Sequence, residues 1–160
     1  GMDSEGFSRE DGRTSIFDYW SVSTIREWFK GKYDTNLRLL YKQILNLSIN
    51  EKAFRIGSTY DLEYANLENT DFNPAFHYAF VRKHGNELII AVVNFGDNPS
   101  DVKIHIPSAL FSYFKISDGI VCRGQDLFTD NKAQYAISSL SPFIVTIAGR
   151  GIRAIKLLLQ

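Results

Sequence analysis

The stretch FHYAFVRKHGNELIIAVVNF, residues 76–95, predicts a β-hairpin. Its two arms, Phe76–Lys83 and Glu87–Phe95, are rich in β-branched and aromatic residues, which are typical of strands. Between them lies the tripeptide HGN, residues 84–86, a short glycine-containing connection of the kind that joins antiparallel strands. We therefore expect both arms to pair within one antiparallel sheet.

Further short runs of the same kind lie on both sides of the hairpin. Turn residues separate them at 96–100 and at 149–151. Short strands without helices between them are typical of an antiparallel sandwich or barrel. We expect a mainly β fold, an antiparallel β-sandwich of Greek-key type with about 7 to 8 strands. The runs outside the hairpin are Thr59–Tyr64, Val102–Ile106, Tyr135–Ser138, Phe143–Ala148 and Ile152–Leu158.

Before these strands the periodicity is helical. Thr24 and Glu27 form a capping-box pattern, which predicts a short helix at about 24–29. An apolar stripe with helical spacing predicts a longer amphipathic helix over 36–47. Leu39 lies away from this stripe, so we expect the helix to pack between two partners. The stripe consists of Leu37, Leu40, Tyr41, Ile44 and Leu45.

The change of periodicity near Gly57 predicts a boundary within the chain. We expect residues 2–55 to hold a loop and one or two α-helices. Residues 56–160 are expected to form the all-β sandwich.

Length and composition exclude several classes of protein. The chain has 160 residues, 44% of them hydrophobic, which suits one globular core but not a (β/α)8 barrel of roughly 250 residues. Its 18 Lys and Arg balance 18 Asp and Glu, so we expect no nucleic-acid partner. No apolar run reaches the roughly 20 residues that span a bilayer, so we expect a soluble chain without a membrane partner.

Residues that commonly carry chemistry are scattered. His77, His84 and His105 lack the spacing of metal ligands, so we expect no metal site and no cofactor. The acidic residues between Asp3 and Asp11 lie in a glycine-rich stretch that cannot fix the separation a catalytic carboxylate pair needs. Cys122 has no histidine in a nucleophile pattern and is expected to be a structural thiol.

Aromatic residues are abundant, with 12 Phe, 8 Tyr and 2 Trp. The period of two places Phe76, Tyr78 and Phe80 on one face of a strand, and we expect that face to fill the core rather than to stack on a ligand. Trp20 and Trp28 lie before the main helix, on segments whose packing partners the sequence does not show. They are therefore the candidate carbohydrate contacts.

The order of these segments resembles the C-terminal portion of bacterial α-amylase-like glycoside hydrolases, the large α-glucan-active family 13. The stretch Glu5–Trp20 is similar to the segment after the last barrel strand of that family, and Leu37–Leu47 to its final barrel helix. Lys52–Gly57 resembles the lead into its C-terminal domain. The run Tyr78–Arg82 followed by Leu88–Phe95 is similar to paired strands of its C-terminal sandwich, which an Asn-Phe pair closes.

The resemblance implies a non-catalytic module. The family's catalytic residues lie on earlier barrel strands, and none of their motifs occurs in this sequence, so no catalytic residue is assigned and the chain alone is not expected to be an enzyme. Its expected partner is the catalytic barrel of its own parent protein, which it would stabilise. A helix face left uncovered without the barrel would favour either a homodimer or an N-terminal segment that folds over that face.

Two other functions remain open. One is a carbohydrate-binding module for starch or maltooligosaccharides, which would make an α-glucan a further partner. The other is an immunoglobulin-like interaction domain, in which the helical part would be independent of the sandwich. The single cysteine permits no intramolecular disulfide, so the bacterial cytoplasm and the periplasm are both compatible with the sequence.

Overall fold

The computed structural model describes residues 36–159. The loop predicted over 2–20 and the short helix predicted at 24–29 lie outside the described residues. Helix α2 (Asn36–Asn50) covers the helix predicted over 36–47 and continues to Asn50. The chain from Leu47 onward forms one compact unit, which begins with the last turn of α2 and the short helix α3 (Lys52–Ile56). The proposed boundary near Gly57 stays a prediction.

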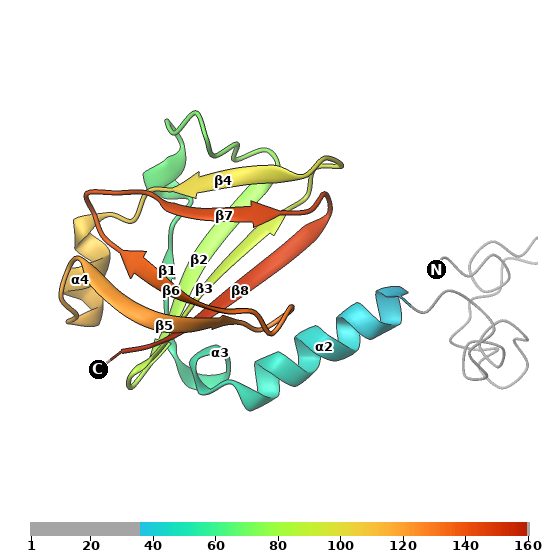
Figure 1. Ribbon diagram of the computed structural model, residues 1–160, viewed down its shortest axis with the longest axis horizontal. Helices are drawn as coiled ribbons and strands as arrows, with labels where there is room; N and C mark the ends of the chain where they lie inside the picture. Colours follow the sequence, from blue (N-terminus) through green and yellow to red (C-terminus); the bar gives the residue numbers. More distant parts are fainter. Residues whose placement is uncertain (1–35, 160) are drawn as a thin grey trace, which may run out of the picture. The chain divides into compact units, whose positions relative to one another are not determined.

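The described strands form a two-layered antiparallel structure (Figure 1). They are β1 (Ser58–Asp61), β2 (His77–His84), β3 (Glu87–Asn94), β4 (Ser100–Ile104), β5 (Ile120–Asp126), β6 (Lys132–Ile137), β7 (Phe143–Ile147) and β8 (Gly151–Leu158). The larger sheet has the order β1-β2-β3-β8-β5-β6, and β4 pairs with β7 in the smaller one. The mainly β sandwich is therefore confirmed. Its division into six and two strands differs from the four and three strands of an immunoglobulin constant-type domain.

Each predicted run overlaps a strand, and the 76–95 stretch forms the β2–β3 hairpin, with His84 paired to Glu87. The expectation of no helices between the strands was wrong, because α4 (Ser108–Phe114) lies between β4 and β5 and the 3-10 helix η1 (Tyr64–Asn66) between β1 and β2. Helix α4 spans 7 residues, and Lys115 ends it with φ of 54°. So short a helix shows too few turns for an apolar period.

Strand β5 was not predicted because its sequence, IVCRGQD, interrupts the apolar pattern with polar residues and Gly124. A Cβ at Gly124 would lie 2.5 Å from Cδ2 of Leu157 and 2.6 Å from Cδ2 of Tyr135. The glycine therefore allows the close packing of its neighbours. Cys122 lies on the same strand with its thiol buried, as expected of a structural residue, and burial raises its pKa.

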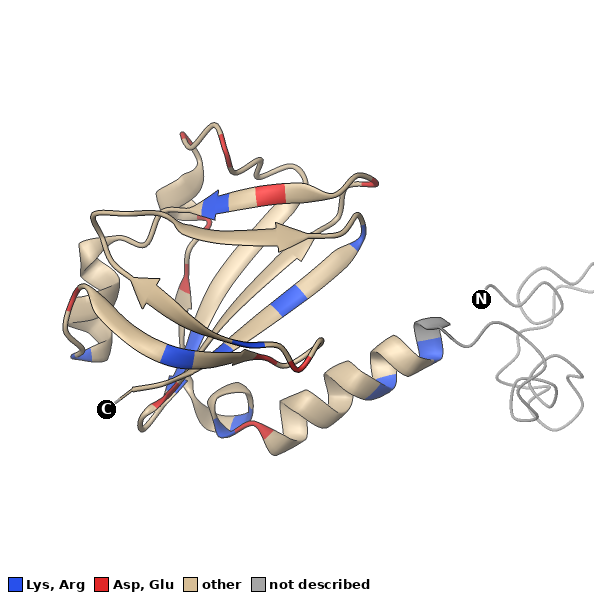
Figure 2. Ribbon diagram, in the orientation of Figure 1, with Lys and Arg blue, Asp and Glu red and all other residues tan. Residues whose placement is uncertain are grey.

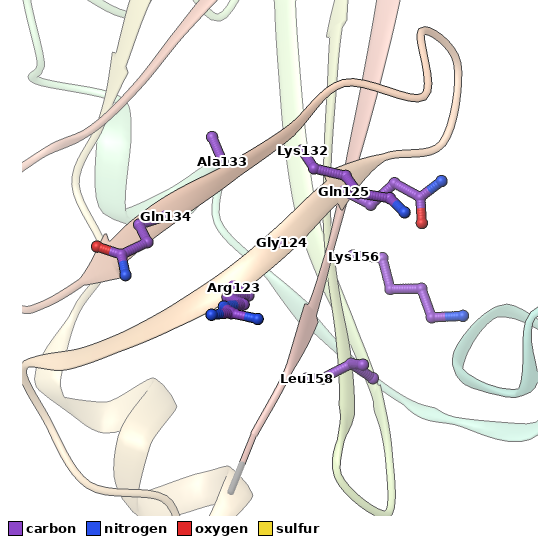
Figure 3. A pocket seen from close by; sticks show the side chains of 8 residues that line it. All are labelled: Arg123, Gly124, Gln125, Lys132, Ala133, Gln134, Lys156 and Leu158. Atoms are coloured by element: carbon purple, nitrogen blue, oxygen red, sulfur yellow. The ribbon is translucent and has the colours of Figure 1, made fainter.

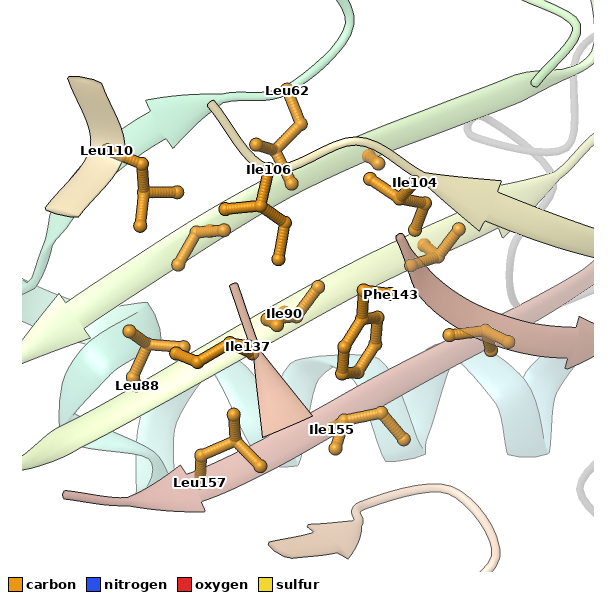
Figure 4. Packing of buried hydrophobic residues seen from close by; sticks show 14 of the residues in the cluster. Leu62, Leu88, Ile90, Ile104, Ile106, Leu110, Ile137, Phe143, Ile155 and Leu157 are labelled. Atoms are coloured by element: carbon orange, nitrogen blue, oxygen red, sulfur yellow. The ribbon is translucent and has the colours of Figure 1, made fainter. Parts of the chain in front are cut away.

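The main core lies between the two sheets (Figure 4). Inward side chains of β3 and β8 meet those of β4 and β7, and residues from the connections and α4 close the ends of the core. Burial of this contiguous apolar surface is the main stabilising contribution to the sandwich. Members that are at most 4% exposed include Leu62, Leu88, Ile90, Ile104, Ile106, Leu110, Ile137, Phe143, Ile155 and Leu157.

Candidate functional site

The aromatic face of β2 points away from the core, which overturns the expectation from the sequence. Phe76 is 50% exposed and Tyr78 36% exposed, whereas Ala79 and Val81 on the opposite face are buried in the core. The period of two correctly placed the rings on one face. It could not decide which face, because both faces of β2 carry apolar residues.

Outward apolar side chains continue across three neighbouring strands. The register places Tyr78 opposite Val93 and Val93 opposite Ile152, while Phe80 lies opposite Ala91. The exposed side of an antiparallel sandwich is usually polar, so a continuous apolar surface there indicates a covered or docking face. We call this surface the outer sheet face. It comprises Tyr78, Phe80, Ile89, Ala91, Val93, Ile152 and Ala154.

Helix α3 covers one end of the outer sheet face. Its Ala53 is fully buried against Ile89 and Ala154, and the ring of Phe54 lies 6.5 Å from that of Phe80. The remainder of the face is less well covered, since Tyr78 keeps more than a third of its surface in solvent. The sheet therefore has apolar contacts on both sides, but on the outer side they are incomplete.

Two charged side chains of the hairpin hold α3 in place. Arg82 donates from Nε to the carbonyl oxygen of Ala53 (3.0 Å) and from Nη2 to that of Phe54 (2.8 Å). Near the N-terminal end of the helix, the N–H of Ala53 donates to Oε1 of Glu87 (2.7 Å). Helix ends leave backbone groups without intrahelical partners. These bonds pair the N–H of Ala53 and the carbonyl oxygen of Phe54, whereas the carbonyl oxygen of Ala53 also accepts from the N–H of Gly57. We call the arrangement of Arg82, Glu87 and α3 the α3 clasp.

Lys156 of β8 reinforces the clasp. Its Nζ lies 2.5 Å from Oε2 of Glu51 and 3.5 Å from Oε2 of Glu87. Burial acts to lower the pKa of Lys156, but the hydrogen bond and charge of Glu51, aided by Glu87, outweigh it and raise the pKa. The ammonium group is therefore charged under ordinary conditions and ties the residue before α3 to the sheet.

The β1 end of the outer sheet face is acidic. Burial raises the pKa of Tyr78, and the nearby carboxylates of Asp61 and Glu63 raise it further. Tyr78 thus stays a neutral phenol at the border between the apolar surface and these two charges. A partner that covers this face would meet rings in the middle and acids at the β1 edge.

The other half of the larger sheet has a different character. A hollow of about 650 Å³ lies over β5, β6 and β8 (Figure 3), and Lys and Arg residues stand on β5 and β8 (Figure 2). The register places Arg123 opposite Gln134 and Gln125 opposite Lys132. The eight described residues that line the hollow include no aromatic ring, so among them there is no platform on which a sugar ring could stack.

Several predicted features do not converge on a site. Trp20 and Trp28 lie outside the described residues. Residues 36–159 contain no group of three or more His, Cys, Asp or Glu placed to hold a metal ion. Within the same range no helix is long and apolar enough to cross a membrane. On α2, Tyr41 is 60% and Leu39 50% exposed. The homodimer through this helix stays a prediction.

Sequence reasoning missed the outer sheet face and the α3 clasp, although β3 carried a signal. Every position from Leu88 to Val93 is apolar, without alternation. Continuous apolar runs are typical of strands covered on both faces. Arg82 and Glu87 flank the hairpin turn, but nothing in the sequence indicates that they bind a helix about 30 residues earlier.

Comparison with known proteins connects the fold to glycoside hydrolases. No family model and no curated protein matches the amino-acid sequence. Among solved structures, a maltogenic α-amylase from Thermotoga neapolitana is similar with a TM-score of 0.58 and 17% identity, over 80% of this chain and 27% of that chain. An α-amylase from Geobacillus thermoleovorans has a TM-score of 0.54 and 11% identity, over 79% and 24%.

The similarity is one of fold and extends beyond α-amylases. The α-galactosidase I from Mortierella vinacea has a TM-score of 0.52 and 11% identity, over 81% of this chain and 30% of that chain. In all three cases the chain spans less than a third of the matched protein. The chain therefore has the fold of a minor part of glycoside hydrolases, which confirms the resemblance to α-amylase-like enzymes at the level of the fold.

Proposed function

We propose that the chain is a non-catalytic module of an α-glucan-active glycoside hydrolase, and that its outer sheet face packs against the catalytic barrel of the same protein. The observation that carries the proposal is the apolar, incompletely covered outer sheet face on a fold that makes up about a quarter of the matched α-amylases. The module stabilises the barrel by burying apolar surface of both parts.

The energetic contribution follows from the part-exposed apolar side chains. Covering an apolar side chain such as Val93 contributes about 1.5–3 kcal/mol for full burial and less for a residue already partly covered. The α3 clasp fixes the segment that leads into the sandwich, so the barrel and the sheet meet in a defined orientation. The substrate of the whole enzyme is handled by the barrel, and this chain supplies no catalytic group.

The immunoglobulin-like alternative has less support. Its sheets would divide into four and three strands, whereas the described residues divide into six and two. The fold neighbours are glycoside hydrolases, which also favours the module.

The test of docking uses the complete gene product. We expect Tyr78→Ser with Val93→Ser to lower the melting temperature of the catalytic domain, measured by calorimetry, while the same changes in the 160-residue chain alone leave the sandwich folded. Leu140→Ser is the control, because Leu140 is 94% exposed and lies between β6 and β7. If the melting temperature of the catalytic domain is unchanged, or if the gene product contains no barrel, the docking proposal is refuted.

The test of catalysis uses the purified 160-residue chain with maltooligosaccharides. We expect no release of reducing sugar above the buffer rate. Hydrolysis that survives repeated purification would show that the chain is itself an enzyme.

A further inference from the structure

A groove of about 550 Å³ lies at the end of the sandwich where β2 begins, β3 ends and β4 begins. One wall precedes and starts β2 and consists of Thr70, Asp71, Asn73, Phe76 and His77. The other lies around the β3–β4 turn and consists of Asn94 and residues 96–101. We call it the β3–β4 groove. Its volume falls within the range of about 300–1,000 Å³ typical of small-ligand pockets.

The groove has an exposed aromatic wall. Phe76 is 50% exposed and lies next to Gly96, where a Cβ, if one were present, would come 3.6 Å from Cγ of the phenyl ring. The glycine therefore leaves the space beside the ring without a side chain. The face of an aromatic ring carries partial negative charge and attracts weakly positive C–H groups such as those on the apolar face of a pyranose.

A nearly buried donor also lines the groove. His77 is 8% exposed, and its Nδ1 accepts a hydrogen bond from the backbone N–H of Asn73 (3.0 Å). In a neutral imidazole the proton is then on Nε2. Among the described residues no acceptor binds this N–H, and because His77 lines the groove the N–H can donate to a ligand there.

Three carboxylates of the groove are held by one oxygen each. Oδ2 of Asp71 lies 3.2 Å from Nζ of Lys103, Oδ1 of Asp97 lies 2.6 Å from Nε of Arg150, and Oδ1 of Asp101 accepts from Thr146 (2.7 Å). These bonds orient each group and leave its second oxygen to accept from a ligand hydroxyl. Orientation before binding reduces the entropy that binding costs.

The lining selects for an uncharged ligand rich in hydroxyl groups. Its described residues include three carboxylates and neither lysine nor arginine, and Lys103 and Arg150 are already paired with Asp71 and Asp97, so the lining offers no free cation to an anionic ligand. Within residues 36–159 no acidic cluster is placed to hold a metal ion. Donors, acceptors and one exposed ring together match a neutral sugar.

We propose that the β3–β4 groove binds a short segment of an α-glucan, with a pyranose ring stacked on Phe76 and its hydroxyls bonded to His77 and the three carboxylates. The choice of an α-glucan rests on the proposed function; the choice of a neutral sugar rests on the groove. The site is distinct from the hollow over β5, β6 and β8 and from the predicted contacts Trp20 and Trp28.

The experiment is affinity electrophoresis of the 160-residue chain in gels that contain glycogen, galactomannan or no polysaccharide. We expect glycogen to retard the chain, and Phe76→Ala to weaken the binding at least fivefold. Phe95→Ala is the matched control, because Phe95 is the neighbouring exposed phenylalanine, is 66% exposed and does not line the groove. Circular dichroism and thermal unfolding establish that both variants are folded.

A second variant keeps the test decisive if Phe76→Ala unfolds. Asn98→Ala removes an exposed amide of the lining whose side chain makes no hydrogen bond with the described residues, and we expect it to weaken glycogen binding about threefold. If glycogen does not retard the chain, or retards the Phe76 and Phe95 variants equally, the proposal that the groove binds the sugar is refuted. If galactomannan alone retards the chain, the proposal that the ligand is an α-glucan is refuted. The docking test on the complete gene product is unaffected by these results, so the two proposals fail separately.

Discussion

Replacing Arg82 with methionine tests whether the α3 clasp joins the helix to the sheet. Methionine keeps an unbranched apolar stem along the strand but cannot donate a hydrogen bond. The change therefore removes the bonds from the guanidinium to the carbonyl oxygens of Ala53 and Phe54, together with the bond to the hydroxyl of Thr59. The main core lies on the other side of the sheet and is left intact.

The magnitude follows from the number and burial of these bonds. Hydrogen bonds to charged groups contribute about 1.5–3 kcal/mol each when well buried. The two bonds to α3 are part-buried, and the one to Thr59 is exposed, so water replaces some of the loss. We expect a total of about 2 kcal/mol, which lowers the melting temperature by roughly 8 °C for a unit of this size.

The assay combines thermal unfolding with amide hydrogen exchange. Arg82→Met should lower the melting temperature and speed exchange in α3, at Ala53–Gly57, more than in β3. Lys83→Met is the control, since Lys83 is the next residue on the same strand and its ammonium group donates to the carbonyl oxygen of Gly85 in the local turn. If Arg82→Met changes stability by less than about 0.5 kcal/mol, the range of ordinary surface substitutions, the clasp is not a structural device.

Three further predictions follow from the described residues. Burial lowers the pKa of His77, and the unfolded chain therefore binds the proton more readily than the folded one. The contribution of His77 to stability is complete above about pH 6.5 and is lost as the pH falls through the lowered pKa. Urea unfolding from pH 7.5 to 5 measures this loss, and His77→Gln, which keeps an acceptor for the N–H of Asn73, should flatten the pH dependence. Gly124→Ala should cost about 1–3 kcal/mol in urea unfolding, because its Cβ would collide with Leu157 and Tyr135, and a neutral result would contradict the close packing. Tyr41→Ser with Ile44→Ser on α2 should convert a dimer to a monomer in sedimentation velocity, whereas a monomeric parent chain would contradict association through this helix.

The hairpin was predictable because its signals are local. The residues that form β2 and β3 adjoin their own turn, and their β-branched and aromatic content matches the pairing that the structure shows. Strand β5 was not predictable from its own sequence. Its Gly124 is explained by close packing against Leu157 and Tyr135, which lie elsewhere in the sequence. Elements defined by distant neighbours leave little local pattern.

The candidate site was harder to predict than the fold for the same reason. The sequence placed Phe76, Tyr78 and Phe80 on one face, but the side of the sheet that holds the core depends on which strands supply the opposing layer. That layer is the β4–β7 pair, whose sequence separation from β2 hides the relationship. The clasp likewise joins Arg82 to carbonyl groups 28 and 29 residues earlier.

The composition of β3 links the fold to the proposed docking. A strand in the middle of a sheet that is apolar at every position from Leu88 to Val93 needs a cover on each face. The β4–β7 pair covers the inner side, whereas α3 covers the outer side at Ile89 and leaves Val93 part-exposed. Burying that residue and the adjacent Tyr78 requires a second apolar surface. Under the proposed docking, a catalytic barrel joined through α3 would supply such a surface without a separate association step, because the chain itself would keep the two parts at high local concentration.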